Sequence, residues 1–219
     1  GDYWNISTEK TIMPQLGQGT IAKPYQKPHP PIVVTAVAPF SKGVTAAAER
    51  GWDPISANFL QPKWVKSHWP NYQQGCEAGG RIADVKNWRV AKSIFVADDD
   101  TTARRYVTSP DGPYYFYYNS LFTKLKAGGR ANLFKTEFDM PDEDLNVATI
   151  VEQLVIYGTP DSVTDQILAF REETGDFGTL LYAGHDWMDK KLARRSMELM
   201  ATHVMPAVNK AISKSAAMA

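Results

Sequence analysis

Short runs of strand-forming residues alternate along this chain with longer segments that have the features of helices, and this alternation limits the fold more than any other feature. The run IVVTAV at 32–37 is nearly continuous in apolar and β-branched residues, as in strands buried on both faces. Further strands are predicted at 55–60, 88–97 and 178–183. Two parallel strands need a connection of about a dozen or more residues, usually a helix. The sequence therefore predicts an α/β fold in which helices cover parallel strands.

The connections after the first two strands carry start and stop signals of helices. Ser41 is a suitable N-cap for a helix that Gly51 would end. Pro62 would occupy the first turn of the next helix, which we expect to kink at Pro70. The glycines of the AGGR segment at 78–81 would end it.

The second half of the chain predicts further helices and one region that is harder to assign. The clearest helix lies at 158–175, where Thr159 caps it, Gly175 ends it and a buried stripe runs through Val163, Ile167 and Phe170. Another helix begins after the acidic residues of DDDTTARRYV, and a long final helix covers 190–212. The region 110–150 predicts two helices joined by a mobile segment, and 1–30 predicts an irregular connection with a short strand at Tyr3 and Trp4.

Composition and motifs exclude several classes of function. Lysine and arginine total 24, and so do aspartate and glutamate, so the formal net charge of zero provides no basic field for nucleic acid or an anionic membrane. Cys76 is the single cysteine, which excludes an intrachain disulfide, and the four histidines show no metal-ligand spacing. No apolar run reaches the roughly 18 residues of a membrane span. We expect a cytoplasmic protein without a metal.

The junction between the first strand and its helix, at 36–45, has the chemistry of a phosphate site. A strand that runs directly into a helix brings free backbone N–H groups and the positive helix end to one place. Ser41 adds a hydroxyl, Gly43 keeps the approach open, and Ala36 and Ala38 leave space above the strand. The alternative is an ordinary turn with a serine cap, which is a common arrangement. The residues alone leave both possibilities open.

Four segments in fixed order resemble a known family. They are TAVAPFSKGVTAAAERG, WRVAKSIFVADDDTTARR, GTPDSVTDQI and HDWMDKKLARRSMELMATHVMPAV. Together they are similar to the carboxy-terminal half of the bacterial-luciferase-like, flavin-dependent monooxygenases, and most of all to the branch with the limonene and diketocamphane monooxygenases. The resemblance covers about residues 20–210. Each segment alone is a weak signal, whereas the ordered set is specific.

The resemblance implies a (β/α)8 TIM barrel with reduced FMN at the carboxyl ends of its strands. The family holds the FMN phosphate partly in the turn after its fifth strand, which matches Ala36, Val37, Ala38, Phe40 and Ser41 here. The chain would then supply strands five to eight, with 110–150 as the family's insertion between strands seven and eight. A complete barrel takes about 250 residues. We therefore expect residues 1–219 to form a single domain that is the later part of a longer barrel, paired with its missing half or with a second copy.

The same barrel geometry suggests residues near a substrate, because active sites of such barrels lie at the carboxyl ends of the strands. Asn58 and Phe59 end the second predicted strand, and His185 and Trp187 follow the last one. His185 can equally hydrogen-bond a loop, and Phe59 can equally belong to the core. The aromatic run YYFYY at 114–118 predicts either a pocket wall or core packing. No catalytic residue is assigned.

The resemblance implies a bacterial monooxygenase that uses O2 and reduced FMN from a separate flavin reductase. Its substrate would be a small apolar organic molecule, such as a terpene or a cyclic ketone. Two alternatives remain open, namely an oxidoreductase that uses the deazaflavin F420 and a non-catalytic flavin-binding subunit. Oxygen uptake by the purified protein with FMN and a reductase would distinguish the three.

Overall fold

The computed structural model describes residues 3–5, 7, 9, 12–16, 19, 24–137, 139–185 and 187–218, and the chain divides into the units Gly1–Ile32 and Val33–Ala219. In the first unit, a 3-10 turn spans Pro14–Leu16. Tyr3 and Trp4 are strongly exposed and lie outside any strand, so the short strand expected there is wrong. The expectation of a single domain across the whole chain stays a prediction.

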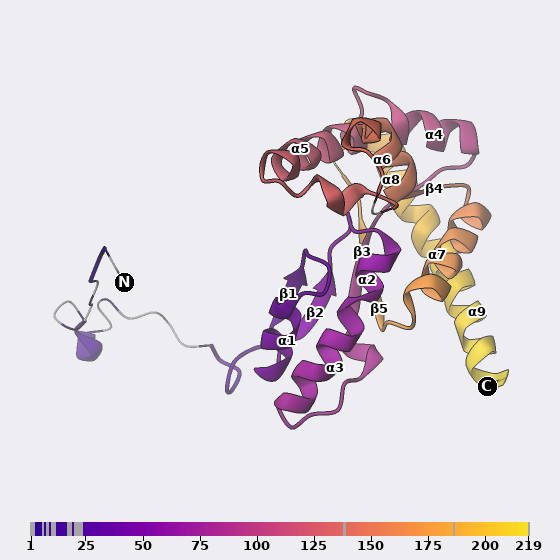
Figure 1. Ribbon diagram of the computed structural model, residues 1–219. Coiled ribbons are helices and arrows are strands. Elements are labelled where there is room, and N and C mark those ends of the chain that lie inside the picture. The colour runs from indigo at the N-terminus through magenta and orange to yellow at the C-terminus, as the bar shows by residue number, and fades with distance from the viewer. Residues whose placement is uncertain are drawn as a thin grey trace. The chain divides into compact units, whose positions relative to one another are not determined.

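The second unit is built on one parallel sheet (Figure 1). Its strands are β1 (Val33–Ala36), β2 (Asp53–Ser56), β3 (Arg89–Val96), β4 (Val155–Gly158) and β5 (Thr179–Ala183). They lie in the order β1-β2-β3-β4, and β5 also pairs with β3. Every pairing is parallel. The predicted α/β class with parallel strands is therefore confirmed.

Two strands differ from the expectation. β2 is shorter and earlier than the predicted 55–60, because the chain turns after Ser56 toward the next helix. β4 was not predicted, since Val155 follows the helix that ends at Leu154 without a glycine or proline between them. Gly158 at its end has a φ of 145°, and a Cβ there would lie 2.8 Å from the Ser162 hydroxyl oxygen. This close approach explains the glycine.

Helices and short 3-10 segments fill the connections. The α-helices are α1 (Lys42–Glu49), α2 (Pro62–Lys66), α3 (His68–Ala78), α4 (Asp100–Thr108), α5 (Pro113–Ala127), α6 (Val147–Leu154), α7 (Pro160–Thr174), α8 (Lys190–Leu199) and α9 (Met205–Met218), and the 3-10 segments are Val85–Asn87, Ala131–Phe134 and Asp142–Asp144. Helix α7 has the predicted bounds, its cap at Thr159 and its end at Gly175, whose φ is 94°. Its predicted stripe is buried.

Two predicted helices are interrupted. The helix expected from Pro62 breaks at Ser67, whose hydroxyl donates a hydrogen bond to the Trp64 carbonyl over 2.6 Å. Pro70 falls in the first turn of α3, where its missing N–H is tolerated. The final helix changes to a π-helical segment at Met200–Val204, directly before α9 and Pro206. Such π segments occur as single turns inside longer helices.

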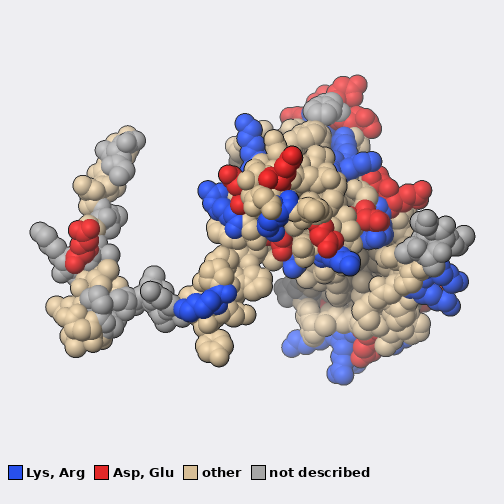
Figure 2. Space-filling model, turned by 90° about the horizontal axis from the view of Figure 1, so that it is seen from below, with Lys and Arg blue, Asp and Glu red and all other residues tan. Residues whose placement is uncertain are grey.

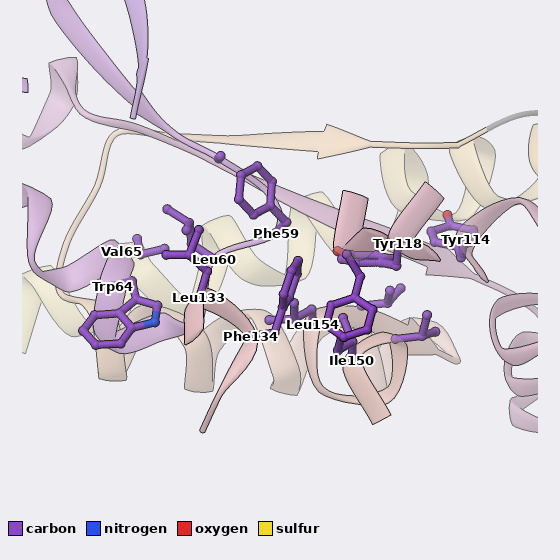
Figure 3. Packing of buried hydrophobic residues seen from close by; sticks show 14 of the residues in the cluster. Phe59, Leu60, Trp64, Val65, Tyr114, Tyr118, Leu133, Phe134, Ile150 and Leu154 are labelled. Atoms are coloured by element: carbon purple, nitrogen blue, oxygen red, sulfur yellow. The ribbon is translucent and has the colours of Figure 1, made fainter. Parts of the chain in front are cut away.

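The largest core cluster joins the sheet to the 110–150 region. Figure 3 shows its members from α2, α5, the 3-10 segment Ala131–Phe134 and α6, together with Phe59 and Leu60 after β2. The labelled residues are Phe59, Leu60, Trp64, Val65, Tyr114, Tyr118, Leu133, Phe134, Ile150 and Leu154. A second cluster packs Ile94 and Val96 of β3 against α7 and the π segment. The 110–150 region therefore belongs to the core.

Charged side chains of both signs lie on the surface (Figure 2), as the balanced composition suggests. On the face drawn in Figure 2, basic and acidic side chains are interspersed. Within the described residues, every helix is too short or too polar to cross a membrane. The described residues also contain no group of three or more histidine, cysteine, aspartate or glutamate side chains placed to bind a metal ion.

Candidate functional site

In the register of the sheet, β2 ends beside the start of β3 and β5 ends beside the middle of β3. Ser56, the last residue of β2, pairs with Val90, and Ala183, the last residue of β5, pairs with Ser93. Strand β3 continues for three residues beyond Ser93, to Val96. Loop residues just past β2 and β5 therefore meet the polar side chain of Ser93, which is completely buried.

A network of hydrogen bonds forms around the Ser93 hydroxyl. His185 Nε2 lies 2.8 Å from Ser93 Oγ, and Asn58 Nδ2 donates to the same oxygen over 2.8 Å. The Tyr118 hydroxyl also donates to Ser93 Oγ, over 3.0 Å. Tyr117 donates to Asn58 Oδ1 over 3.0 Å. The loops after β2 and β5 are thus joined to each other through β3 and helix α5.

Aromatic rings enclose His185. Tyr117 stacks on the imidazole with a centroid distance of 4.1 Å, and Tyr114 meets it edge-on at 4.7 Å. Burial among these rings lowers the pKa of His185 to about 4, so the imidazole is neutral at physiological pH. Burial raises the pKa of Tyr118, which keeps its phenol protonated. The network therefore consists of neutral hydrogen-bonding groups.

A hollow of about 230 Å³ lies beside this network, and we call it the His185 hollow. Its lining includes Phe95, Tyr114, Tyr182, His185, Trp187 and Met197. These side chains come from the ends of β3 and β5, from α5 and from α8. Aromatic side chains form most of its walls, and the tyrosines and His185 add polar atoms to them. Sites that bind small organic molecules commonly combine apolar walls with a few placed polar groups.

The predicted substrate-pocket residues have different environments. Asn58 and His185 are brought together through Ser93, and Trp187 lines the hollow with 46% of its surface exposed. Phe59 packs in the core with its ring 6.5 Å from Phe134, and it is not among the described residues that line the hollow. Phe59 is therefore part of the core, and a contact with substrate stays a prediction.

Sequence reasoning missed Ser93, which connects the network. A signal was available, because Lys92 and Ser93 interrupt an otherwise apolar strand. Polar side chains in a buried strand need partners. The partners themselves, Tyr117 and Tyr118, belong to the aromatic run whose role was left open.

The turn between β1 and α1 has unusual geometry. Ala36 is buried at the end of the strand, Val37 is exposed, and Phe40 adopts a φ of 48°. A positive φ is rare for a bulky residue, and strained backbone positions of this kind cluster at functional sites. Ser41 holds the N-cap position of α1, yet its side chain makes no capping hydrogen bond to the described residues. Its hydroxyl is therefore not used in the way the simple serine-cap alternative requires.

Buried polar groups hold this turn from below. His68 Nε2 lies 2.8 Å from the Ala38 carbonyl oxygen, and His68 Nδ1 lies 2.8 Å from Ser56 Oγ. The Trp88 indole N–H donates to Ser56 Oγ over 3.1 Å. Burial lowers the pKa of His68, so the imidazole that holds the turn is neutral. No role for His68 is predicted from the sequence, because its hydrogen bonds to Ala38 and Ser56 join residues that are distant along the chain.

Some backbone N–H groups of the turn are already hydrogen-bonded within the protein, and others have no acceptor among the described residues. The Phe40 N–H donates to Ser67 Oγ over 2.9 Å, so it is not free for a ligand as the sequence suggested. The N–H groups of Lys42 and Gly43, in the first turn of α1, have no acceptor among the described residues. Arg130, after α5, donates to the Val37 carbonyl over 3.3 Å and adds a positive charge. An anion bound at this turn could therefore contact backbone N–H donors and a hydroxyl, with a cation nearby.

Comparison with known proteins gives a family and several relatives. The family model described as luciferase-like monooxygenase matches residues 5–176. The chain is 28% identical to 3,6-diketocamphane 1,6-monooxygenase of Pseudomonas putida over 95% of its own length and 56% of the relative. It is 27% identical to limonene 1,2-monooxygenase of Rhodococcus erythropolis over 79% of the chain and 46% of the relative. The chain thus spans about half the length of the curated relatives it matches.

A solved structure shares the fold. It is the oxygenating constituent of 3,6-diketocamphane monooxygenase from the CAM plasmid of Pseudomonas putida, a type II Baeyer-Villiger monooxygenase in complex with FMN. The TM-score is 0.72 with 29% identity, and the match covers 81% of this chain and 49% of the other. A monooxygenase of Streptomyces bottropensis, at 22% identity and a TM-score of 0.55, supports the fold alone.

Proposed function

The chain belongs to the luciferase-like monooxygenase family, and from this premise we propose that it is part of a monooxygenase that uses O2 and reduced FMN. Strands β1, β2, β3 and β5 would correspond to strands five to eight of a (β/α)8 barrel, with 110–150 as the insertion before the last strand. The relatives support this proposal, since each is named a monooxygenase. For the same reason we prefer it to an F420-dependent oxidoreductase or a non-catalytic subunit.

The observation that carries the proposal is that Ser41, at the N-cap position of α1, makes no capping hydrogen bond with its hydroxyl. A serine in this position normally accepts a hydrogen bond from the helix. Here the hydroxyl makes no such bond within the described chain, and the N–H groups of Lys42 and Gly43 beside it are also free there. A phosphate would satisfy all three donors and would be favoured by the helix dipole. The residues present therefore fit the phosphate of FMN.

The remaining residues would position the flavin and shield it. Ala36 and Ala38 have small side chains that leave space above the sheet, while Val37 and Phe40 project from the turn with 40% and 66% of their surfaces exposed. When bound, reduced FMN supplies the electrons that activate O2. The protein would orient the ring and exclude water, and the tyrosines of α5 are placed to do so at the ends of β3 and β5.

The proposed substrate is a small apolar organic molecule of the terpene or cyclic-ketone type. Relatives with these names support the class, and the aromatic His185 hollow offers matching walls. Asn58 would hold His185 in place through Ser93, and Trp187 would border the substrate. The proposal also includes a separate flavin reductase as partner and a bacterial cytoplasmic location. It further includes either a homodimer or a pairing with a further half of the barrel.

Replacement of Ser41 by alanine tests the cofactor site. We expect Ser41→Ala to weaken FMN binding by about 1–3 kcal/mol, the loss of a hydrogen bond to a charged group. Its free energy of unfolding should change by less than about 0.5 kcal/mol, because no cap is lost. Titration of the native full-length protein with FMN and urea denaturation measure the two effects.

Asn146→Ala is the matched control, because Asn146 caps α6 with a hydrogen bond from the Thr149 N–H over 2.9 Å. It should lose about 1 kcal/mol of stability without a change in FMN affinity. Unchanged FMN affinity in Ser41→Ala would contradict the proposed cofactor site. Oxygen uptake with FMN, a reductase and a cyclic ketone then tests the monooxygenase activity itself.

A further inference from the structure

We infer that His185 is a fixed hydrogen-bond donor, through its Nδ1–H, to a ligand with an acceptor oxygen in the His185 hollow. The inference deepens the proposed function and rests on it, because it assigns an atom and a polarity to the proposed substrate site. It follows from the direction of each hydrogen bond around Ser93. The sequence leaves two roles open for His185, namely contact with a ligand and a hydrogen bond within the protein. We assign the first role to Nδ1 and the second to Nε2.

The hydroxyl of Ser93 has one proton to donate and two lone pairs that accept. Asn58 Nδ2 donates to one lone pair. The orientation of this amide is consistent with its other end, since Asn58 Oδ1 accepts from the Tyr117 hydroxyl. In this orientation, the first lone pair of Ser93 accepts from Asn58 Nδ2.

Tyr118 occupies the second lone pair. Its side chain is completely buried, and its hydroxyl has no other acceptor among the described residues. If Tyr118 accepted from Ser93 instead, its own O–H would be buried without a partner, which costs about 1–3 kcal/mol. Tyr118 must therefore donate to Ser93.

The proton of Ser93 then has one acceptor left, His185 Nε2, at 2.8 Å. A nitrogen that accepts carries no proton in the neutral ring, so the ring proton lies on Nδ1. Stacking against Tyr117 and the edge contact with Tyr114 fix the plane of the ring. Burial keeps the pKa of His185 near 4, so this single tautomer persists at neutral pH.

His185 Nδ1–H has no hydrogen-bond acceptor among the described residues. Because His185 lines the hollow, this donor can meet a ligand there. The described residues that line the hollow include apolar side chains such as Phe95 and Met197 and the hydroxyl-bearing Tyr182, and none of them carries a charge at neutral pH. A small ring with a carbonyl or ether oxygen would satisfy the donor, whereas a hydrocarbon of the same shape would leave it desolvated and unpaired.

The tautomer is the first test. In the native full-length protein with 15N-labelled histidine, NMR should show His185 protonated at Nδ1 and unprotonated at Nε2. Ser93→Ala removes the donor to Nε2 and should allow the proton to move to that nitrogen. A wild-type spectrum with the proton on Nε2 would overturn the inference.

Ligand preference is the second test, with cyclohexanone and its isostere methylenecyclohexane as probes. The wild-type protein should bind the ketone about five-fold more tightly, and the infrared stretch of its carbonyl should shift to lower frequency. His185→Phe retains an aromatic ring against Tyr117 but has no donor, so the preference and the shift should disappear. His203→Phe, at an exposed position in the π segment, is the matched control and should retain both.

Equal binding of the two probes, or no binding of either, would also overturn the inference, as would a ketone preference that survives His185→Phe. FMN titration of the same samples separates this failure from that of the proposed function. If FMN binds and the ketone preference is absent, only the role of His185 is wrong. If FMN does not bind, the flavin site is wrong, while the tautomer measurement still decides whether the network is as described.

Discussion

Neighbouring polar residues of β3 serve opposite sides of the sheet. Ser93 connects the network around His185, whereas Lys92 lies with its ammonium 5.0 Å from the Phe170 ring of α7. Lys92 is only 3% exposed, and burial lowers its pKa to about 8. Because successive strand side chains point to opposite faces, one polar pair in the sequence supplies a site residue and a buried cation.

Lys92→Met should increase stability. At pH 7 the folded protein holds a charged, buried lysine whose desolvation is only partly offset by the charge of Glu173, so a methionine of similar shape should raise the free energy of unfolding by roughly 1–3 kcal/mol. The lowered pKa of Lys92 also predicts how the stability of the wild type depends on pH. Between pH 8 and about 10.5 the unfolded chain keeps a proton that folded Lys92 has released, so wild-type stability should rise with pH across that window.

Urea denaturation at pH 7 and pH 9.5 measures both effects. The Lys92→Met variant should lack the rise that the wild type shows between these values. Lys124→Met, an exposed position on α5, is the control and should change little at either pH. Lower stability of Lys92→Met at pH 7 would show that the contact with Phe170 outweighs the cost of burial.

At the scale of elements, helix α5 connects the two parts of the candidate site. Its tyrosines surround His185, and Arg130 just beyond its end contacts the carbonyl of Val37 in the β1–α1 turn. The same helix contributes Tyr114, Tyr118 and Phe122 to the main core. Packing of α5 therefore fixes the position of the proposed substrate and cofactor contacts together.

Arg130→Gln should weaken binding of FMN and leave binding of riboflavin unchanged. The reason is that Arg130 would act on the phosphate, which riboflavin lacks. An exposed charge contributes up to about 1 kcal/mol, or roughly a five-fold change in Kd. Fluorescence titration with the two flavins measures the effect, and it should shrink as salt is added. Arg105→Gln, exposed on α4, is the control; an equal loss for both flavins in Arg130→Gln would instead indicate a structural defect.

At the scale of the whole molecule, the sheet of the second unit has several strands with a single partner. Among the described residues, β1 pairs only with β2, and β4 and β5 each pair only with β3. Val33 and Leu181 on these strands are 40% and 49% exposed. An apolar hollow of about 420 Å³ adjoins β5, lined in part by Leu180, Met200 and Met205. Open edges and apolar surface of this kind favour association.

The isolated 219-residue chain is therefore expected to self-associate or to require a partner. With a formal net charge of zero, long-range repulsion between copies is weak. Light scattering over a range of concentrations should show species larger than a monomer. A monomer that unfolds sharply without a partner would mean that these residues close their own core, and it would remove the reason to propose a further half of the barrel.

The sequence by itself determined the α/β class, the parallel pairing and the limits of α7, because these depend on local signals: apolar periodicity, caps and the lengths of connections. It also predicted Asn58 and His185 near one edge of the sheet, where the carboxyl ends of parallel strands meet, and the structure has both residues in loops just after β2 and β5; their role at a substrate site stays a prediction. The tertiary structure alone decided that Ser93 joins them, and that Ser41 leaves its helix uncapped. Ser93 is separated by 35 positions from Asn58 and by 92 positions from His185. Strand register and side-chain packing bring these residues together, and no local pattern in the sequence shows which residues will meet.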